Sequence, residues 1–313
     1  MSNDKNDLLK VLLMVFIIAG IILGFYSIYH VGEMAYTAMF KKRIRIEYFK
    51  ERLNSEVKRM NTVILAAQNT PKDVATIFEF HPTTEDEIKI LIQSVLFNNE
   101  EISGCAVAFE PYNYKKDSLY FSTYAFRSKD SIRFTNLNGD DYNYFYKDWY
   151  LIPKTLNQPV WSEPYFDMGG SNLLMSTYSV PIYQLADRKE KFAGVVTIAV
   201  SIDWLADAVE SVGRILKSKA ALISENGTVI AAPNRALIYN ETIFTVAEQR
   251  NLPVLREIGR ELQQGKSGFK KGYDGNDVWY IFYAVVPTNR WGMFLFVSED
   301  ELMQTGRTVK GIF

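Results

Sequence analysis

The chain has 313 residues, with 35 Lys and Arg against 36 Asp and Glu, and 14% of its residues are aromatic. This near-neutral balance argues against nucleic acid as a partner, because phosphate binding needs clustered positive charge. The length allows two domains or one elongated domain, and the abundant aromatic residues favour a folded, β-rich chain over a disordered one.

The first predicted element is a membrane-spanning helix. Residues 11–29, "VLLMVFIIAGIILGFYSIY", carry no charge, and about 20 such residues cross the hydrocarbon core as a helix. A cleaved signal peptide would have a shorter apolar region and a better cleavage site. We therefore expect a cytoplasmic N-terminus at residues 1–10 and a transmembrane helix at 11–30.

A long helix is predicted next, over residues 31–70. Apolar residues such as Phe49, Leu53 and Val57 follow at helical spacing, and neither Gly nor Pro occurs from Glu33 to Ala67. We expect this helix to be a common spine for the two α+β units that follow.

The first α+β unit is predicted at residues 71–208. A break precedes a helix from about Thr84 to Asn98, which Thr84 can cap. Four strand-like runs follow, and Asp203 can cap a helix in the last segment. The four strand-like runs are "SGCAVAFEP", "SLYFSTYAF", "NLLMSTYSVPIY" and "KFAGVVTIAVSI", and the predicted helix is "DWLADAVESVGRI".

A smaller α+β unit is predicted at residues 209–302. "KAALISENGTVIAAP" predicts a hairpin with a type I′ turn at Asn226–Gly227. A helix, "LPVLREIGRELQQG", precedes an antiparallel pair of strands joined at "TNR". Residues 303–313 are expected to begin a second membrane-directed segment that is cut short.

The sequence argues against an enzyme. The histidines His30 and His81 have no Cys or His at metal-ligand spacing, so a zinc site or a Ser-His-Asp hydrolase is not expected. Cys105 lies in an apolar run and is expected to be buried. "NLNGDDYN" is partly similar to a calcium loop but lacks the EF-hand spacing. We expect no catalytic residue, no metal and no cofactor.

Several separated motifs carry a family resemblance. "YKDWY", "PVWSEPYFD", "LLMSTYSVPIY" and "GVVTIAVSIDWL", with "GYDGNDVWYIFYAVVPTNRWGMFLFVSEDEL" downstream, resemble the double Cache (dCache) extracytoplasmic sensor domain of bacterial signal-transduction proteins over residues 34–305. The resemblance implies an α+β fold of two stacked, PAS-like Cache modules with antiparallel sheets. The version here is most similar to sensors fused to protein phosphatase 2C-like serine phosphatases, although sensor histidine kinases and chemoreceptors use the same input domain.

The resemblance also implies a ligand pocket in the membrane-distal module. Trp149 and Tyr150 match a Trp-Tyr pair of amino-acid-binding dCache sensors, and Tyr165 and Asp167 match a Tyr-Asp that holds the ligand ammonium. Lys147 stands at the position of the arginine that holds the ligand carboxylate. Three further candidates complete the predicted site: Ala199, at the position of a second ammonium-binding aspartate, and Tyr124 and Thr177, on neighbouring strands.

These departures change the expected ligand. A lysine lacks the bidentate fork of arginine, and Ala199 cannot accept a hydrogen bond from an ammonium. The sequence therefore favours a small organic carboxylate over an α-amino acid, with an amine caged by aromatic rings as the competing ligand. Alternatively, Trp149, Trp161 and Phe166 are core residues.

The predicted function is ligand sensing outside the cytoplasm, with the chain anchored in the inner (cell) membrane by one N-terminal helix. The ligand would bias the long helix and transmit a conformational change across the membrane. The basic cluster at 41–45 would by itself place the rest of the chain in the cytoplasm, and we follow the resemblance instead. A homodimer through the long helices fits this class of protein. The alternative is a membrane-anchored interaction protein that senses a protein partner and binds no small ligand.

Overall fold

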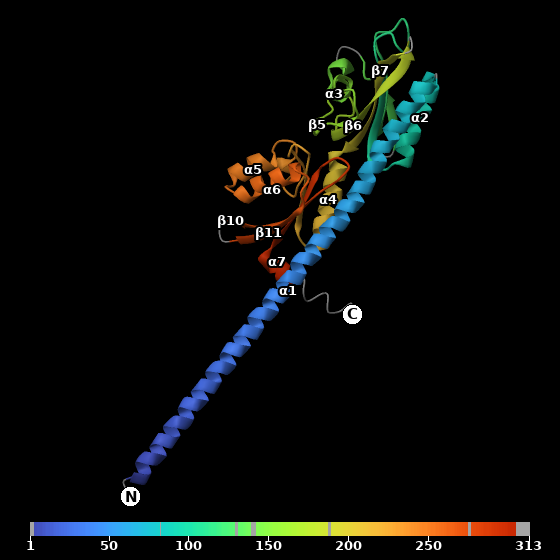
Figure 1. The fold of residues 1–313 in the computed structure, drawn as a ribbon. Coiled ribbons are helices and arrows are strands. Elements are labelled where there is room, and N and C mark those ends of the chain that lie inside the picture. Colours follow the sequence, from blue (N-terminus) through green and yellow to red (C-terminus); the bar gives the residue numbers. More distant parts are fainter. Residues whose placement is uncertain are drawn as a thin grey trace. The chain divides into compact units, whose positions relative to one another are not determined.

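The computed structural model describes residues 3–304, except residues 82, 129–130, 139–141, 187–188 and 275–276. The chain divides into two compact units, one made of residues 1–49 and 300–313 and the other of Lys50–Glu299. Helix α1 (Asn3–Phe80) contributes to both units, and two antiparallel sheets belong to the second (Figure 1). The predicted α+β class is confirmed.

In the first unit, α1 carries the apolar segment that the sequence predicted to span a membrane. Its side chains are exposed from Leu13 to Tyr29, and Phe16, for example, is 74% exposed. Among the described residues, α1 is the one helix long and apolar enough to cross a membrane. Exposed apolar side chains around a helix suit a lipid environment better than water.

In the second unit, α1 buries one stripe of side chains at intervals of three or four residues: Leu53, Val57, Met60, Ile64 and Ala67. This spacing places them on one face of the helix. The helix contacts both sheets. The ring of Phe78 lies 5.8 Å from that of Phe109, and the Asn61 side-chain oxygen accepts a hydrogen bond from the backbone N–H of Thr288 at 2.8 Å. It is a spine common to both sheets, as the sequence predicted.

The end of α1 differs from the predicted helix 31–70. The helix continues through Pro71 to Phe80, although a proline inside a helix removes one backbone hydrogen bond and costs about 3 kcal/mol. Val74, Ala75 and Phe78, all beyond the proline, are buried. Their burial offsets that cost, so tertiary packing overrides the local signal.

The first sheet holds seven strands among the described residues, in the order β3-β2-β1-β7-β6-β4, with β5 paired to β6. The strands are β1 (Ile102–Phe109), β2 (Phe121–Ser128), β3 (Ser131–Thr135), β4 (Val160–Trp161), β5 (Tyr165–Phe166), β6 (Leu174–Ala186) and β7 (Lys189–Ser201). Helix α2 (Glu85–Asn98) packs on β1 and β2, and α3 (Asp148–Leu156) packs on β6 and β7. Thr84 caps α2 as predicted, in a capping box with Glu87.

The second sheet has the order β10-β11-β12-β8-β9. Its strands are β8 (Lys219–Ile223), β9 (Val229–Ala231), β10 (Gly268–Asp274), β11 (Asp277–Val285) and β12 (Gly292–Ser298), and its helices are α5 (Ile243–Gln249) and α6 (Pro253–Gln263). The two helices pack together, and α6 contacts β10 and β11 (Figure 1, orange). Helix α4 (Ile202–Leu216) joins the sheets, so the predicted boundary at 208/209 falls inside it. Helix α7 (Glu299–Gln304) follows β12, and residues 305–313 of the predicted second membrane-directed segment lie outside the described residues.

The hairpin between β8 and β9 has a different turn from the predicted type I′. The backbone N–H of Gly227 donates to the carbonyl of Ser224 at 3.0 Å, so the turn runs from Ser224 to Gly227. Gly227 has a φ of +96°, whereas Asn226 is not among the residues with positive φ. A type I′ turn needs positive φ at both central residues, and the sequence signal therefore located the hairpin but not its geometry.

The cap of α4 also differs from the prediction. The Ser201 hydroxyl accepts the hydrogen bond from the backbone N–H of Trp204, and Asp203 instead pairs with Arg235 at 3.4 Å. We expect Ser201→Ala to lower the free energy of unfolding by about 1 kcal/mol, the usual value for an N-cap. Asp203→Asn removes only an exposed pair and should lower it by about 0.5 kcal/mol or less. Urea denaturation of both variants tests this, and a larger loss for Asp203→Asn would contradict the assignment.

Candidate functional site

One face of the first sheet carries a small cavity of about 20 Å³. Its lining residues come from five strands, α3 and the loops before and after them: Gly104, Ala106, Tyr124, Leu137, Tyr142, Trp149, Tyr165, Asp167, Met175, Thr177, Thr197 and Ala199. Such a volume holds about one water molecule.

Strand register explains why these residues meet. Ala106 of β1 lies opposite Tyr124 of β2 and Thr197 of β7, and Ala199 lies opposite both Gly104 and Thr177. Side chains that are directly opposite one another in a sheet point to the same face. Glycine and alanine at the centre leave a shallow space, into which the larger side chains lean.

A buried carboxylate faces this cavity. Asp167, which is 5% exposed, accepts a hydrogen bond from the Tyr142 hydroxyl at 3.0 Å, and two more from the backbone N–H and hydroxyl of Ser171 at 2.8 and 3.0 Å. The indole N–H of Trp149 donates to the Tyr142 oxygen at 3.0 Å. These donors hold the carboxylate in place, but none of them is a cation.

The tyrosines around Asp167 are hydrogen-bond donors at neutral pH. Burial raises the pKa of Tyr124, Tyr142 and Tyr165, and the negative charge of Asp167 raises each pKa further. The Tyr124 hydroxyl, whose side chain is buried, makes no hydrogen bond to any described residue. The cavity is therefore lined by one negative charge, by aromatic rings and by an unused polar group.

The structure brings together six of the eight residues predicted from the sequence. Tyr124, Trp149, Tyr165, Asp167, Thr177 and Ala199 all line the cavity. Lys147, half-buried just before α3, does not line it; its ammonium lies 4.5 Å from the centre of the Tyr142 ring. Sequence reasoning missed Tyr142, because it lies in an irregular segment, and Ala106 and Thr197, which the alternation of β1 and β7 would have revealed.

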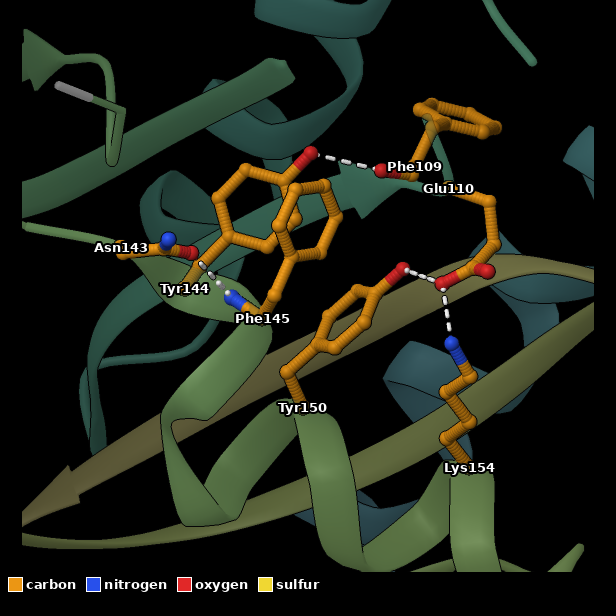
Figure 2. Close-up of polar contacts among 7 residues, drawn as sticks. All are labelled: Phe109, Glu110, Asn143, Tyr144, Phe145, Tyr150 and Lys154. Atoms are coloured by element: carbon orange, nitrogen blue, oxygen red, sulfur yellow. Dashed lines mark hydrogen bonds and ion pairs between the residues drawn. The ribbon is translucent and has the colours of Figure 1, made fainter. Parts of the chain in front are cut away.

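Tyr150 points into a different cluster. Its hydroxyl donates to Glu110 Oε1 at 2.7 Å, and the Lys154 ammonium contacts the same oxygen at 2.7 Å (Figure 2). Tyr150 and Lys154 are four residues apart on α3 and so share one face of the helix. Beside them, the Tyr144 hydroxyl donates to the Phe109 carbonyl at 2.6 Å. The aromatic residues from Tyr142 to Tyr165 thus divide into those that line the cavity and those that pack in the core.

The Glu110 cluster ties α3 to the end of β1, and we expect its loss to destabilise the fold. Glu110→Ala leaves the buried Tyr150 hydroxyl without an acceptor, which should lower the free energy of unfolding by about 1–3 kcal/mol. Lys154→Met removes only a partly exposed ion pair and should cost at most about 1 kcal/mol. Equilibrium denaturation of both variants is the measurement, and equal losses would show that the ion pair dominates.

Comparison with known proteins agrees with this architecture. Residues 88–207 match the family described as methyl-accepting chemotaxis protein-like, first PDC sensor domain. The methyl-accepting chemotaxis protein TlpQ of Pseudomonas aeruginosa is 23% identical over 242 residues, which are 68% of this chain and 32% of TlpQ. The chain therefore spans about a third of the length of this curated relative.

Two solved structures have a similar fold. The extracellular domain of the proposed histidine kinase mmHK1S-Z2 has a TM-score of 0.70 at 19% identity, over 83% of this chain and 99% of that domain. The ligand-binding domain of the amino acid chemoreceptor PctB of Pseudomonas aeruginosa PAO1, in complex with L-Arg, has a TM-score of 0.59 at 14% identity, over 86% of this chain and 93% of that domain. The chain has the double Cache, or PDC, fold of the extracellular sensor domains of chemoreceptors and histidine kinases.

Proposed function

We propose that the chain is the ligand-sensing input region of a membrane-bound bacterial signalling protein. The apolar segment of α1 anchors it in the inner (cell) membrane, and the Cache modules lie outside the cytoplasm. The match of residues 88–207 to a sensor family, the fold and the exposed apolar segment support this proposal. The chain binds the ligand and transmits a conformational change, and catalysis belongs to a separate output region. The serine phosphatase output expected from the sequence has no support among the proteins compared above and stays a prediction.

The buried carboxylate of Asp167 is the observation that carries the ligand assignment. A buried charge is costly unless it is paired, and no Lys or Arg is among the described residues that line the cavity. Tyr142, Trp149 and Tyr165 add aromatic rings, whose faces attract cations. We propose that the ligand presents a positively charged amine to Asp167.

This proposal reverses the ligand preference drawn from the sequence. The carboxylate was favoured because of Lys147, whose ammonium lies over the ring of Tyr142 and which is not among the lining residues. A carboxylate placed in the cavity would meet the negative charge of Asp167 first. An amine ligand that also carries a carboxylate remains compatible with the geometry, with the carboxylate placed toward Lys147.

The cavity must open for a ligand of several heavy atoms, because about 20 Å³ admits only a water molecule. A ligand that binds only the open conformation shifts the population toward it. Asp167 follows β5, which pairs with β6, and β6 lies beside β7 at the centre of the sheet. Opening would move strands packed near α1, and a homodimer through α1 would pass that movement toward the membrane.

Matched four-carbon probes test this function. The full chain in lipid nanodiscs would be titrated calorimetrically with butylamine, butyrate and 4-aminobutyrate, against empty nanodiscs as the control. Binding of the two amines without butyrate supports the proposal. Binding of butyrate without butylamine would restore the carboxylate preference and remove the role of Asp167.

The closed cavity also favours a second candidate function, a membrane-anchored protein that senses a protein partner. This alternative predicts a distal module whose interior is filled by side chains. The close packing around Trp149 and Tyr142 leaves little space there. Hydrogen exchange separates the two. A small amine should change protection of β5 and β6, whereas a partner-sensing protein would show no change with any of the three probes.

A further inference from the structure

The second sheet carries a cavity much larger than the one that Asp167 lines. Its volume is about 340 Å³, within the range of about 300–1,000 Å³ that small-molecule sites occupy. Buried side chains form its floor, among them Ile223, Ile281 and Phe294. Ile243 of α5 and Leu255 of α6 line it from the helical side. It is a preformed, predominantly apolar space that the proposed distal site does not use.

Register places a cation at the edge of this apolar face. Lys219 of β8 lies opposite Phe296 of β12, which in turn lies opposite Ile281 of β11. The three side chains therefore point to the same face of the sheet, and all three line the cavity. On β10, Gly272 keeps the wall thin, since a Cβ there would lie 3.0 Å from a methyl group of Val254.

The charges around this cavity are of one sign. Lys219 and Arg250 are its two cationic lining residues, and among the described residues that line it none is Asp or Glu. Both cations are exposed, which places them where the cavity opens to solvent. Neither forms an ion pair with a described residue; the Lys219 ammonium lies 5.3 Å from the centre of the Trp279 ring. An apolar interior with two unpaired cations at its opening is complementary to an amphipathic anion.

We propose that this cavity is a second ligand site, which binds a small organic acid with an apolar body. The apolar body would fill the space between the sheet and helices α5 and α6, where it is removed from water. The carboxylate would lie at the opening, within reach of Lys219 and Arg250. The membrane-proximal module thus selects a ligand of opposite charge from the one that Asp167 selects, and it does so with residues that do not line the distal cavity.

Three probes that share one apolar body test the charge preference. The full chain in nanodiscs would be titrated with 3-phenylpropionate, 3-phenylpropan-1-ol and 3-phenylpropylamine, again against empty nanodiscs. We expect the acid to bind about tenfold more tightly than the alcohol, as a charge-assisted hydrogen bond would give. Equal affinity of acid and alcohol, or no binding of the acid, would overturn the proposal.

Variants then locate the site. Ala221→Phe places a ring in the cavity and should abolish binding of the acid. The exposed double variant Lys219→Gln with Arg250→Gln, which leaves the core untouched, should reduce the affinity for the acid to that for the alcohol. Asp167→Asn, in the distal cavity, should leave acid binding unchanged. Acid binding that survives the double variant, or that is lost with Asp167→Asn, would show that the acid binds elsewhere.

Discussion

Asp167→Asn is expected to weaken amine binding by about 10- to 100-fold, because hydrogen bonds to charged groups contribute about 1.5–3 kcal/mol. The amide keeps the size of the carboxylate but removes its charge. It also turns one oxygen into a donor, which faces either the Tyr142 hydroxyl or the backbone N–H of Ser171. We therefore expect the free energy of unfolding to fall by about 1–2 kcal/mol as well. Calorimetric titration with butylamine and urea denaturation measure the two effects.

Lys147→Gln is the matched control for this prediction. It removes a positive charge that lies 4.5 Å from the centre of the Tyr142 ring and does not line the cavity. If the ligand amine is held by Asp167, the lysine variant should bind butylamine at least as tightly as the unchanged chain, because one neighbouring positive charge is gone. Loss of binding in Lys147→Gln with retention in Asp167→Asn would contradict the amine assignment.

The sequence predicted most of the fold because its strands and helices follow simple periodicities. β6 and β7 are rich in β-branched and aromatic residues, as strands are, and α4 buries residues at helical spacing. The predictions that were wrong concern places where tertiary contacts decide. Pro71 lies inside a helix because the residues after it are buried. Ser201 caps α4 in place of the predicted Asp203, which pairs with Arg235.

Part of the candidate site was predicted from the sequence. The family resemblance placed Ala199 there, with Tyr124 and Thr177 as further candidates, and the register of β1, β2, β6 and β7 brings the three to one face of the sheet. Trp149 and Tyr150 were both predicted in the site, but the structure places them in different surroundings, because adjacent helical residues point about 100° apart. One of the two therefore faces the cavity, and the other faces Glu110.

The cavity of the second sheet was not predictable from the sequence. Its walls are common apolar residues at the alternate positions of ordinary strands, such as Ile281 and Phe294. A sequence shows which side chains face inward but not whether their volumes fill the space between sheet and helices. The unpaired charge of Lys219 is likewise visible only once its neighbours are placed.

Trp291→Ala is expected to lower the free energy of unfolding by about 3–5 kcal/mol, the usual cost of truncating a buried aromatic residue. Trp291 is 2% exposed and precedes β12 of the second sheet. Its ring lies 5.3 Å from that of Trp161 on β4, which belongs to the first sheet, and Trp161 lies 5.3 Å from Tyr178 on β6. Trp291→Phe keeps a ring at this position and should cost less. Urea denaturation compares them, and equal stability of Trp291→Ala and the unchanged chain would contradict the role of this stack.

The same stack connects the cavity that Asp167 lines to the second sheet, so Trp291→Ala should also uncouple them. Thr177 lines the cavity, and its neighbour Tyr178 points to the opposite face of the strand, against Trp161. Any shift of β6 that admits a ligand therefore displaces Tyr178, and through it Trp161 and Trp291. We expect butylamine to change hydrogen exchange in both β6 and β12 of the unchanged chain and of Trp291→Phe, but only in β6 of Trp291→Ala. A response that still reaches β12 in the alanine variant would place the coupling in α1, which contacts both sheets through Phe78 and Asn61.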